Sequence, residues 1–319
     1  MRRRLPAVCG PSDVTATAPA ALPTDPVRRV AFLGTPDTSV IVLDALVEAG
    51  IEVAHVVTRV DKRRGRGSTL VPSPVKAAAL AHGVPVSHRV DDLLEISPPI
   101  ELGVVVAYGA IVKPYVLAEI PMVNLHFSLL PRWRGAAPIE RCLLAGDPRT
   151  GVCLMQVDEG LDTGGVLATD VVDVDDQVTA DELRVDLARR GSRLLVDALR
   201  DGLPPAVPQV GDPVYAEKLS NDDRRVVWSE PAATTARRSR IGGAWTELDG
   251  ARVRIGSLRV TDEPSRAEPG TGAVADGRVR VATRDLDVEI LALQPEGKSM
   301  MSARDWSNGR RGAPVRFST

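Results

Sequence analysis

Two polar side chains, Asn124 and His126, lie two residues apart in the segment VNLHFS at 123–128. Side chains alternate between the two faces of a β-strand, so a strand here would turn both toward one face and Leu125 toward the other. An amide and an imidazole on one face can hydrogen-bond a reacting group, although such a pair is more often structural. Position favours function, because the strand runs directly into residues 129–135 and open α/β sheets bind ligands at strand carboxyl ends.

Asp162 is the third candidate for chemistry. It lies in the glycine-rich segment DEGLDTGG at 158–165, between two predicted strands. An aspartate in such a loop commonly bonds its own backbone, and on the loop pattern alone that structural role is the better explanation. A fourth feature is the basic segment at 59–67, with five Lys/Arg and one acid. Most basic runs of this kind are solvated surface loops.

Common cofactor and metal motifs are missing from the sequence. The turn after the first predicted strand, GTPDTS at 34–39, has one glycine where a dinucleotide-binding turn needs three, and no GxxxxGK[ST] loop occurs. The three cysteines have neither CxxC nor Cys/His spacing. This argues against a zinc site and a disulfide framework and favours a reducing compartment, so we expect no metal and a cytoplasmic location.

The elements that must position these residues indicate an α/β fold with two domains. The chain has 319 residues, and single cores usually stop growing near 250. From residue 30 to residue 201, apolar β-branched runs alternate with helical patterns, which predicts a parallel-rich sheet. Thr179 and Glu182 form a predicted capping box for a long helix. A segment rich in Pro and Gly follows at 201–213, as expected of a linker.

Short β runs follow Trp228, with a hairpin signal at Asp276-Gly277, and together they predict a small barrel. We therefore predict a disordered extension at 1–27, a catalytic domain at 28–207, a linker at 208–226 and a β-barrel domain at 227–319. Residues 28–226 carry 22 Lys/Arg against 28 Asp/Glu, whereas residues 227–319 carry 15 against 12. No apolar run approaches the roughly 18 residues that a membrane span needs.

Several segments of the chain resemble the methionyl-tRNA formyltransferase family. They are FLGTPD at 32–37, PSPVK at 72–76, VVVAYG at 104–109, NLHFSLLPRWRGAAPI at 124–139, LDTG at 161–164, YAEKLS at 215–220 and LQPEGK at 293–298, in the family's order. The resemblance implies a Rossmann-like formyltransferase domain with a C-terminal barrel of the oligonucleotide-binding type. It also implies transfer of a formyl group from 10-formyltetrahydrofolate to the amino group of initiator methionyl-tRNA.

The resemblance further implies that Asn124, His126 and Asp162 are the catalytic residues. An amine that attacks the formyl carbon creates an anionic oxygen, to which the Asn124 amide and a His126 N–H could donate. Asp162 would orient the imidazole, favour its charged form and accept the amine proton directly or through water. The folate site is implied to be lined by the next turn of chain, which is formed by Ser128, Leu129, Leu130 and Pro131.

A loop at the position of residues 59–67 inserts into the tRNA acceptor end in the resembled family. We therefore expect tRNA contact from Lys62, Arg63, Arg64 and Arg66. Arg132 and Arg134 could meet the folate glutamate or the RNA terminus, or could be ordinary surface charge. The expected partners are methionyl-tRNA and tetrahydrofolate, with no membrane and with a monomeric chain.

Two other functions stay open. A related formyltransferase acting on glycinamide ribonucleotide or on an amino sugar would use the same three residue types. A catalytically silent tRNA-binding protein is the third possibility. The sequence departs from the family pattern at residues 237–242, where arginines replace a proline-rich turn and leave the first strand of the barrel in doubt. Phe127 stands where the family often has glycine, and its side chain should point away from the catalytic face.

Overall fold

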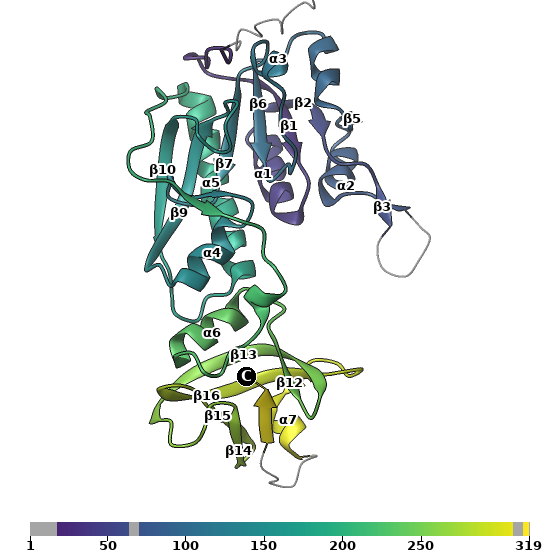
Figure 1. The fold of residues 1–319 in the computed structure, drawn as a ribbon. Helices are drawn as coiled ribbons and strands as arrows, with labels where there is room; N and C mark the ends of the chain where they lie inside the picture. The colour runs from purple at the N-terminus through teal and green to yellow at the C-terminus, as the bar shows by residue number, and fades with distance from the viewer. Residues whose placement is uncertain (1–17, 64–69, 309–314, 319) are drawn as a thin grey trace, which may run out of the picture.

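An α/β domain forms the first two thirds of the chain and a β-barrel the last third (Figure 1). The computed structural model describes residues 18–63, 70–308 and 315–318. The first domain is built on a seven-stranded sheet of order β10-β9-β7-β6-β1-β2-β5. Its parallel strands are β1 (Arg29–Gly34), β2 (Glu52–Val57), β5 (Val86–Ser87), β6 (Leu102–Val106) and β7 (Met122–His126).

The last two strands of this sheet turn back against the others. β9 (Arg149–Gln156) is antiparallel to both β7 and β10 (Val166–Asp173). A parallel-rich rather than fully parallel sheet results, as the sequence predicts. In the described part of the chain, no helix is both long enough and apolar enough to cross a membrane.

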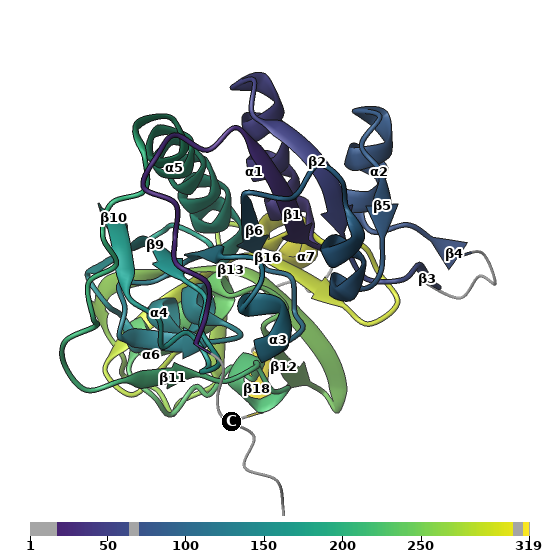
Figure 2. The same ribbon diagram turned by 90° about the horizontal axis from the view of Figure 1, so that it is seen from above.

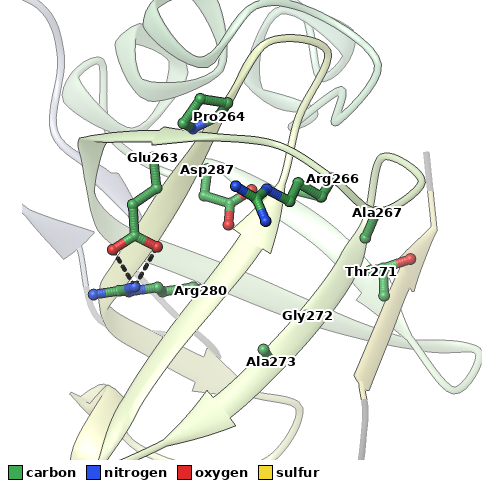
Figure 3. A pocket seen from close by; sticks show the side chains of 10 residues that line it. Glu263, Pro264, Arg266, Ala267, Thr271, Gly272, Ala273, Arg280 and Asp287 are labelled. Carbon is green, nitrogen blue, oxygen red and sulfur yellow. Dashed lines mark hydrogen bonds and ion pairs between the residues drawn. The ribbon is translucent and has the colours of Figure 1, made fainter.

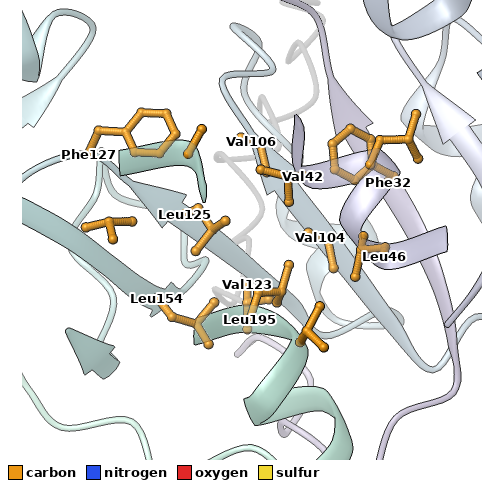
Figure 4. Packing of buried hydrophobic residues seen from close by; sticks show 14 of the residues in the cluster. Phe32, Val42, Leu46, Val104, Val106, Val123, Leu125, Phe127, Leu154 and Leu195 are labelled. Atoms are coloured by element: carbon orange, nitrogen blue, oxygen red, sulfur yellow. The ribbon is translucent and has the colours of Figure 1, made fainter. Parts of the chain in front are cut away.

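Helices α1 (Asp37–Glu48), α2 (Pro74–Ala81) and α5 (Ala180–Asp201) lie side by side along one face of the sheet (Figure 2). Figure 4 shows apolar side chains of β1, β6, β7 and β9 packed against α1 and α5, with Val104 beside Leu46 of α1 and Val123 beside Leu195 of α5. The opposite face is covered in part by α3 (Pro114–Leu117) and the 3-10 turn η1 (Val90–Glu95).

The predicted capping box of α5 is confirmed. The backbone N–H of Glu182 donates to the Thr179 hydroxyl at 3.3 Å, and the Thr179 N–H donates to the Glu182 carboxylate at 2.9 Å. Both bonds satisfy groups that would otherwise lack partners at the helix start, and such a cap typically contributes about 1 kcal/mol. The 22-residue helix thus begins at the position that the sequence indicates.

Six antiparallel strands close the C-terminal barrel, which confirms the predicted fold class. They are β12 (Trp245–Leu248), β13 (Ala251–Pro264), β14 (Thr271–Ala275), β15 (Arg278–Ala282), β16 (Leu286–Pro295) and β18 (Val315–Ser318). β17 (Met301–Ser302) and α7 (Ala303–Asn308) lie beside the barrel. Asp276 and Gly277 have φ of 51° and 74°, the left-handed pair that a tight hairpin requires.

Helix α6 (Ala232–Arg240) lies between the two domains and is a helix that the sequence pattern does not predict (Figure 1). Arg240 donates to the carbonyls of Val178 at 2.8 Å and Asp175 at 2.7 Å, at the start of α5. Arg237 donates to the Ala145 carbonyl at 3.3 Å, at the end of α4 (Pro138–Ala145). The arginines that break the family pattern therefore join the barrel domain to the catalytic domain, and β12 follows them intact.

Residues 18–27 differ from the expected disordered extension. Val27 is buried in the core of the first domain, and its N–H donates to the Leu199 carbonyl at 2.8 Å. Ala20 donates likewise to the Leu117 carbonyl at 2.7 Å, and Leu22 packs on the same core. The run lacks a periodic pattern, so these backbone contacts give no signal in the sequence. Residues 1–17 lie outside the described residues.

Two short strand pairs complete the catalytic domain. β8 (Arg132–Gly135) is parallel to β11 (Val214–Ala216). This pairing places residues that follow α5 in the sequence beside the end of β7. β3 (Lys62–Arg63) is antiparallel to β4 (Leu70–Val71) at the base of the basic segment. The 3-10 turn η2 (Asp222–Arg224) then leads toward the barrel.

Candidate functional site

The face on which Asn124 and His126 lie follows from the alternation of β7. Leu125 and Phe127 belong to the apolar core on the α1 and α5 side, so Asn124 and His126 lie on the opposite face. Both are in the inner part of the sheet, where β7 pairs with β6 and with β9. The predicted outward-facing pair and the predicted direction of Phe127 agree with this arrangement.

Asp162, which is 36 positions after His126 in the sequence, lies beside the same face of β7. Its Oδ2 atom lies 3.6 Å from Nδ1 of His126, with side-chain exposures of 16% and 6%. The same oxygen accepts a hydrogen bond from the backbone N–H of Gly135 at 2.7 Å. Asp162 has a φ of 52°, a left-handed conformation that aspartate adopts more readily than most residues. The loop therefore aims the carboxylate at the imidazole while Gly135 holds one of its oxygens.

The other nitrogen of the imidazole is also bound. His126 Nε2 lies 2.8 Å from the carbonyl oxygen of Trp133, and because a carbonyl can only accept, Nε2 donates. Trp133 itself has a φ of 66°, which turns its carbonyl toward the ring. With Nε2 donating and Nδ1 facing a carboxylate, the ring has a defined orientation, and a charged imidazolium would satisfy both neighbours.

The loop that carries Asp162 is tightly held against β9. A Cβ atom added to Gly164 would lie 2.0 Å from the backbone oxygen of Gln156, so only glycine permits this approach. Asp158 accepts hydrogen bonds from the Gly160 N–H at 3.0 Å and the Thr163 hydroxyl at 2.6 Å. These contacts explain the spacing of the LDTG segment, whose glycine is needed for packing.

Asn124 is half-buried on this face. Its side-chain amide makes no hydrogen bond to any of the residues that the structure describes. The NH₂ group can therefore donate to a bound substrate without first breaking a bond within the protein.

The predicted folate segment forms a turn at the end of β7. Ser128 is buried, and its hydroxyl donates to the Arg132 carbonyl at 2.6 Å. The Arg132 N–H donates to the Leu129 carbonyl at 3.1 Å. Leu129, Leu130 and Pro131 are half-buried and so retain surface for a ligand. Ser128 shapes the turn, whereas the next three residues provide its accessible apolar surface.

Arg132 and Arg134 both have partners within the protein. Arg132 makes two hydrogen bonds to Asp147, at 2.8 and 2.7 Å, and its guanidinium lies 4.4 Å from the Trp133 ring centre. Burial alone would raise the pKa of Asp147, but hydrogen bonds from Arg132 and Trp133 lower it. Arg134 donates twice to Oε1 of Gln209, at 3.0 and 2.7 Å. Gln209 is a residue that the sequence analysis missed.

The basic segment begins on the β3–β4 pair. Lys62 and Arg63 are exposed there, while Arg64 and Arg66 lie outside the described residues. Lys76, from the PSPVK segment, binds both carboxylate oxygens of Asp61 at 2.9 Å. This ion pair fixes the start of the segment to helix α2.

A hollow with a volume of about 440 Å³ lies elsewhere, on the barrel (Figure 3). Glu263 and Arg280 face each other across it in an ion pair at 2.5 Å. This hollow is far from β7 in the fold. We place the chemistry at His126 because the reactive groups come together there. No group of three or more His, Cys, Asp or Glu side chains that could hold a metal ion occurs in the described ranges.

Comparison with known proteins gives matches over both domains. Residues 28–199 match the family model described as Formyl transferase, and residues 218–311 match Formyl transferase, C-terminal domain. A methionyl-tRNA formyltransferase of Corynebacterium diphtheriae is 40% identical, over 88% of this chain and 96% of the relative. Another, of Halorhodospira halophila, is 44% identical, over 90% of this chain and 97% of the relative.

A solved structure, HypX from Aquifex aeolicus in complex with tetrahydrofolic acid, has a similar fold. Its TM-score is 0.60 at 17% identity, and the match covers 88% of this chain and 46% of HypX. At that identity the likeness concerns the fold alone.

Proposed function

This chain belongs to the formyl transferase family, and we propose that it formylates the free amino group of initiator methionyl-tRNA with 10-formyltetrahydrofolate as donor. Relatives at 40% and 44% identity that match nearly the whole chain carry the name methionyl-tRNA formyltransferase. The observation in the structure that carries the proposal is the Asp162–His126 pair at the end of β7, on the face that also carries Asn124.

The reaction joins the methionyl nitrogen to the formyl carbon and breaks the bond from that carbon to N10 of the folate. The amine loses a proton and N10 of tetrahydrofolate gains one, so the step is balanced. Between these events the formyl oxygen becomes anionic, and donors placed toward that oxygen lower the barrier. Asn124 offers its unbonded NH₂ group for this purpose.

His126 and Asp162 act together in this scheme. The charged imidazole stabilises the oxyanion, and its Nε2–H, which donates to Trp133 in the free protein, can be shared with that oxygen. Asp162, 3.6 Å from Nδ1, orients the ring. Its carboxylate is also the nearest described base for the amine proton, which it accepts directly or through a water molecule.

The two substrates are assigned to different surfaces. Leu129, Leu130 and Pro131 contact the folate, and Ser128 shapes their turn. Lys62, Arg63, Arg64 and Arg66 bind the acceptor end of the tRNA. The barrel domain at 227–319, with 15 Lys/Arg against 12 Asp/Glu, supplies general RNA affinity, and the linker at 208–226 joins it to the catalytic domain at 28–207.

We further propose that the enzyme is cytoplasmic and monomeric and that it uses no metal. Cys142 and Cys153 are free, buried thiols, which fits a reducing compartment. The main alternative is a formyltransferase for glycinamide ribonucleotide or an amino sugar. The match of the barrel to the formyl transferase C-terminal domain, together with the near-complete cover of methionyl-tRNA formyltransferases, favours the tRNA.

The test mixes the protein with charged initiator methionyl-tRNA and 10-formyltetrahydrofolate. Blocking of the methionyl amine, detected by mass spectrometry of the released amino acid, supports the proposal. The His126→Asn variant is the control for formylation by a contaminating enzyme. A free amine after prolonged incubation with active donor would contradict it.

A further inference from the structure

We propose that Gln209 is a positioning residue for Asp162, and that it ties the catalytic loop to the chain that leads into the barrel domain. Gln209 lies in the interdomain segment, defined here as residues 202–217, which begins after α5 and includes β11. The inference rests on the proposed function, because that function gives Asp162 its role in formyl transfer.

The amide of Gln209 bridges two parts of the site. Its Nε2 atom donates to the backbone oxygens of Asp162 and Gly164, each at 2.8 Å. Its Oε1 atom accepts both hydrogen bonds from the Arg134 guanidinium, at 3.0 and 2.7 Å. One side chain therefore holds both the Asp162 loop and Arg134. Arg134 is next to Gly135, and the Gly135 N–H donates to the Asp162 carboxylate.

The chemistry at this point requires a side chain with both a donor and an acceptor, which the Gln209 carboxamide supplies. A guanidinium has no acceptor and a backbone carbonyl has no donor, so only a side chain with one of each can join them. The amide orientation is fixed by its neighbours, with the oxygen toward Arg134 and the nitrogen toward the loop. Glutamate in its place could still accept from Arg134 but could not donate to the loop, and its charge would face two carbonyl oxygens.

The backbone of the interdomain segment reinforces this bridge on both sides. Val207 exchanges two hydrogen bonds with Val166, at 2.8 and 2.9 Å, directly after the Asp162 loop. On the other side, Ala216 accepts from Ala136 at 2.8 Å. A Cβ atom on Gly135 would lie 2.9 Å from the Ala216 oxygen, so Gly135 packs directly on β11. Both anchors of Asp162 thus depend on the path of this segment.

The consequence is a specific kinetic signature. Loss of Gln209 frees the loop at its backbone while leaving His126, Asn124 and both binding surfaces in place. A displacement of about 1 Å in a catalytic group can cost about 100-fold in rate. Gln209→Ala should therefore lower kcat by about 10- to 100-fold while KM for tRNA and for folate change less than about twofold.

The experiment measures formyl transfer at saturating methionyl-tRNA and 10-formyltetrahydrofolate for wild type, Gln209→Ala, Gln209→Glu, Asp162→Ala and the double variant of Gln209→Ala with Asp162→Ala. Gln209→Glu should be at least as slow as Gln209→Ala. If Gln209 acts through Asp162, the double variant is no slower than Asp162→Ala alone. Fully additive losses, or unchanged kcat in Gln209→Ala, would overturn the inference. Gln177→Ala, an exposed glutamine before α5, is the matched control and should keep wild-type turnover.

Hydrogen exchange supplies a readout that is independent of activity. The Gly135 amide donates to the Asp162 carboxylate, so it should exchange faster in Gln209→Ala and at the wild-type rate in Gln177→Ala. Unchanged Gly135 exchange in Gln209→Ala refutes the positioning role. A wild-type protein that fails to formylate methionyl-tRNA refutes the proposed function instead, and the exchange result still decides the role of Gln209.

Discussion

Replacing Asp162 with asparagine removes the charge beside His126 and the carboxylate proposed to accept the amine proton, while the shape of the side chain is nearly unchanged. The asparagine oxygen can still accept the Gly135 N–H that Asp162 accepts at 2.7 Å, so the loop should keep its path. The attraction between the carboxylate and a charged imidazole, 3.6 Å apart, is then lost. At an effective dielectric constant of about 20, Coulomb's law gives about 5 kcal/mol for a pair at this distance.

Solvent screening reduces that value, because the Asp162 side chain is 16% exposed. Taking about half of it leaves a loss of about 2–3 kcal/mol in transition-state stabilisation. At about 1.4 kcal/mol per factor of ten, this loss alone should lower kcat by about 30- to 150-fold, and loss of the proton acceptor lowers it further. The free energy of unfolding should change by less than about 1 kcal/mol, since the hydrogen bond to Gly135 survives.

The assay is single-turnover formylation with enzyme in excess over charged tRNA, followed by urea unfolding of the same preparations. Asp173→Asn is the matched control, because Asp173 is a carboxylate on β10 whose side chain is 86% exposed and pairs with Arg149. Turnover of Asp162→Asn within about threefold of wild type would refute the assigned role of the charge. Equal losses in both variants would show an effect of charge removal in general.

Three further predictions concern other parts of the chain. Asn124→Ala should lower turnover by about 100- to 1,000-fold with unchanged tRNA affinity, as measured by equilibrium binding, because one oxyanion donor is lost. Arg66→Ala should weaken tRNA binding and reduce its salt dependence by about one phosphate contact, while folate binding stays constant; an unchanged slope would contradict tRNA contact. Asp147→Asn should lower the free energy of unfolding by about 1 kcal/mol at pH 7, as measured by urea unfolding. The pKa of Asp147 is lowered in the folded state, so its contribution is present above the ordinary value of 3.8 and is lost as the pH falls below it. The difference between this variant and wild type should therefore shrink at pH 3.5.

The elements predicted from the sequence are those whose own residues specify them. Residues 30–33 of β1 and residues 102–106 of β6 are apolar and almost entirely buried, and Thr179 and Glu182 mark the start of α5. The face shared by Asn124 and His126 follows from strand alternation alone. Local pattern and tertiary structure agree in all these cases.

The elements that escaped prediction depend on distant partners. β8 and β11 are short strands joined across some eighty residues, and neither has the length or alternation of a recognisable strand. α6 consists largely of Ala, Thr and Arg, so its helix is fixed by contacts of Arg237 and Arg240 with the catalytic domain. Gln209 is one polar residue in a proline-rich run, and nothing nearby in the sequence indicates that it reaches Asp162.

The proximity of Asp162 to His126 was also beyond what residue types and spacing could establish. Strand alternation places Asn124 and His126 together, but for a loop aspartate in the DEGLDTGG segment a local structural role is the better explanation from the sequence alone. The structure supplies the missing information through the Gly164–Gln156 approach and the Gly135 hydrogen bond, which hold the carboxylate at the ring. In the sequence, only the resemblance of the LDTG segment to the family indicates a catalytic role for Asp162.

Competition between formyl acceptors tests the central claim most directly. Methionyl-tRNA, glycinamide ribonucleotide and a nucleotide-linked amino sugar, at equal concentration, would share one limiting supply of 10-formyltetrahydrofolate labelled in the formyl group. Substrates compete in the ratio of their kcat/KM values, so the distribution of label reports specificity. The account predicts that the label is recovered on the methionyl amine of the tRNA and is absent in the His126→Asn variant. Label recovered on either small acceptor, with methionyl-tRNA left unmodified, would contradict it.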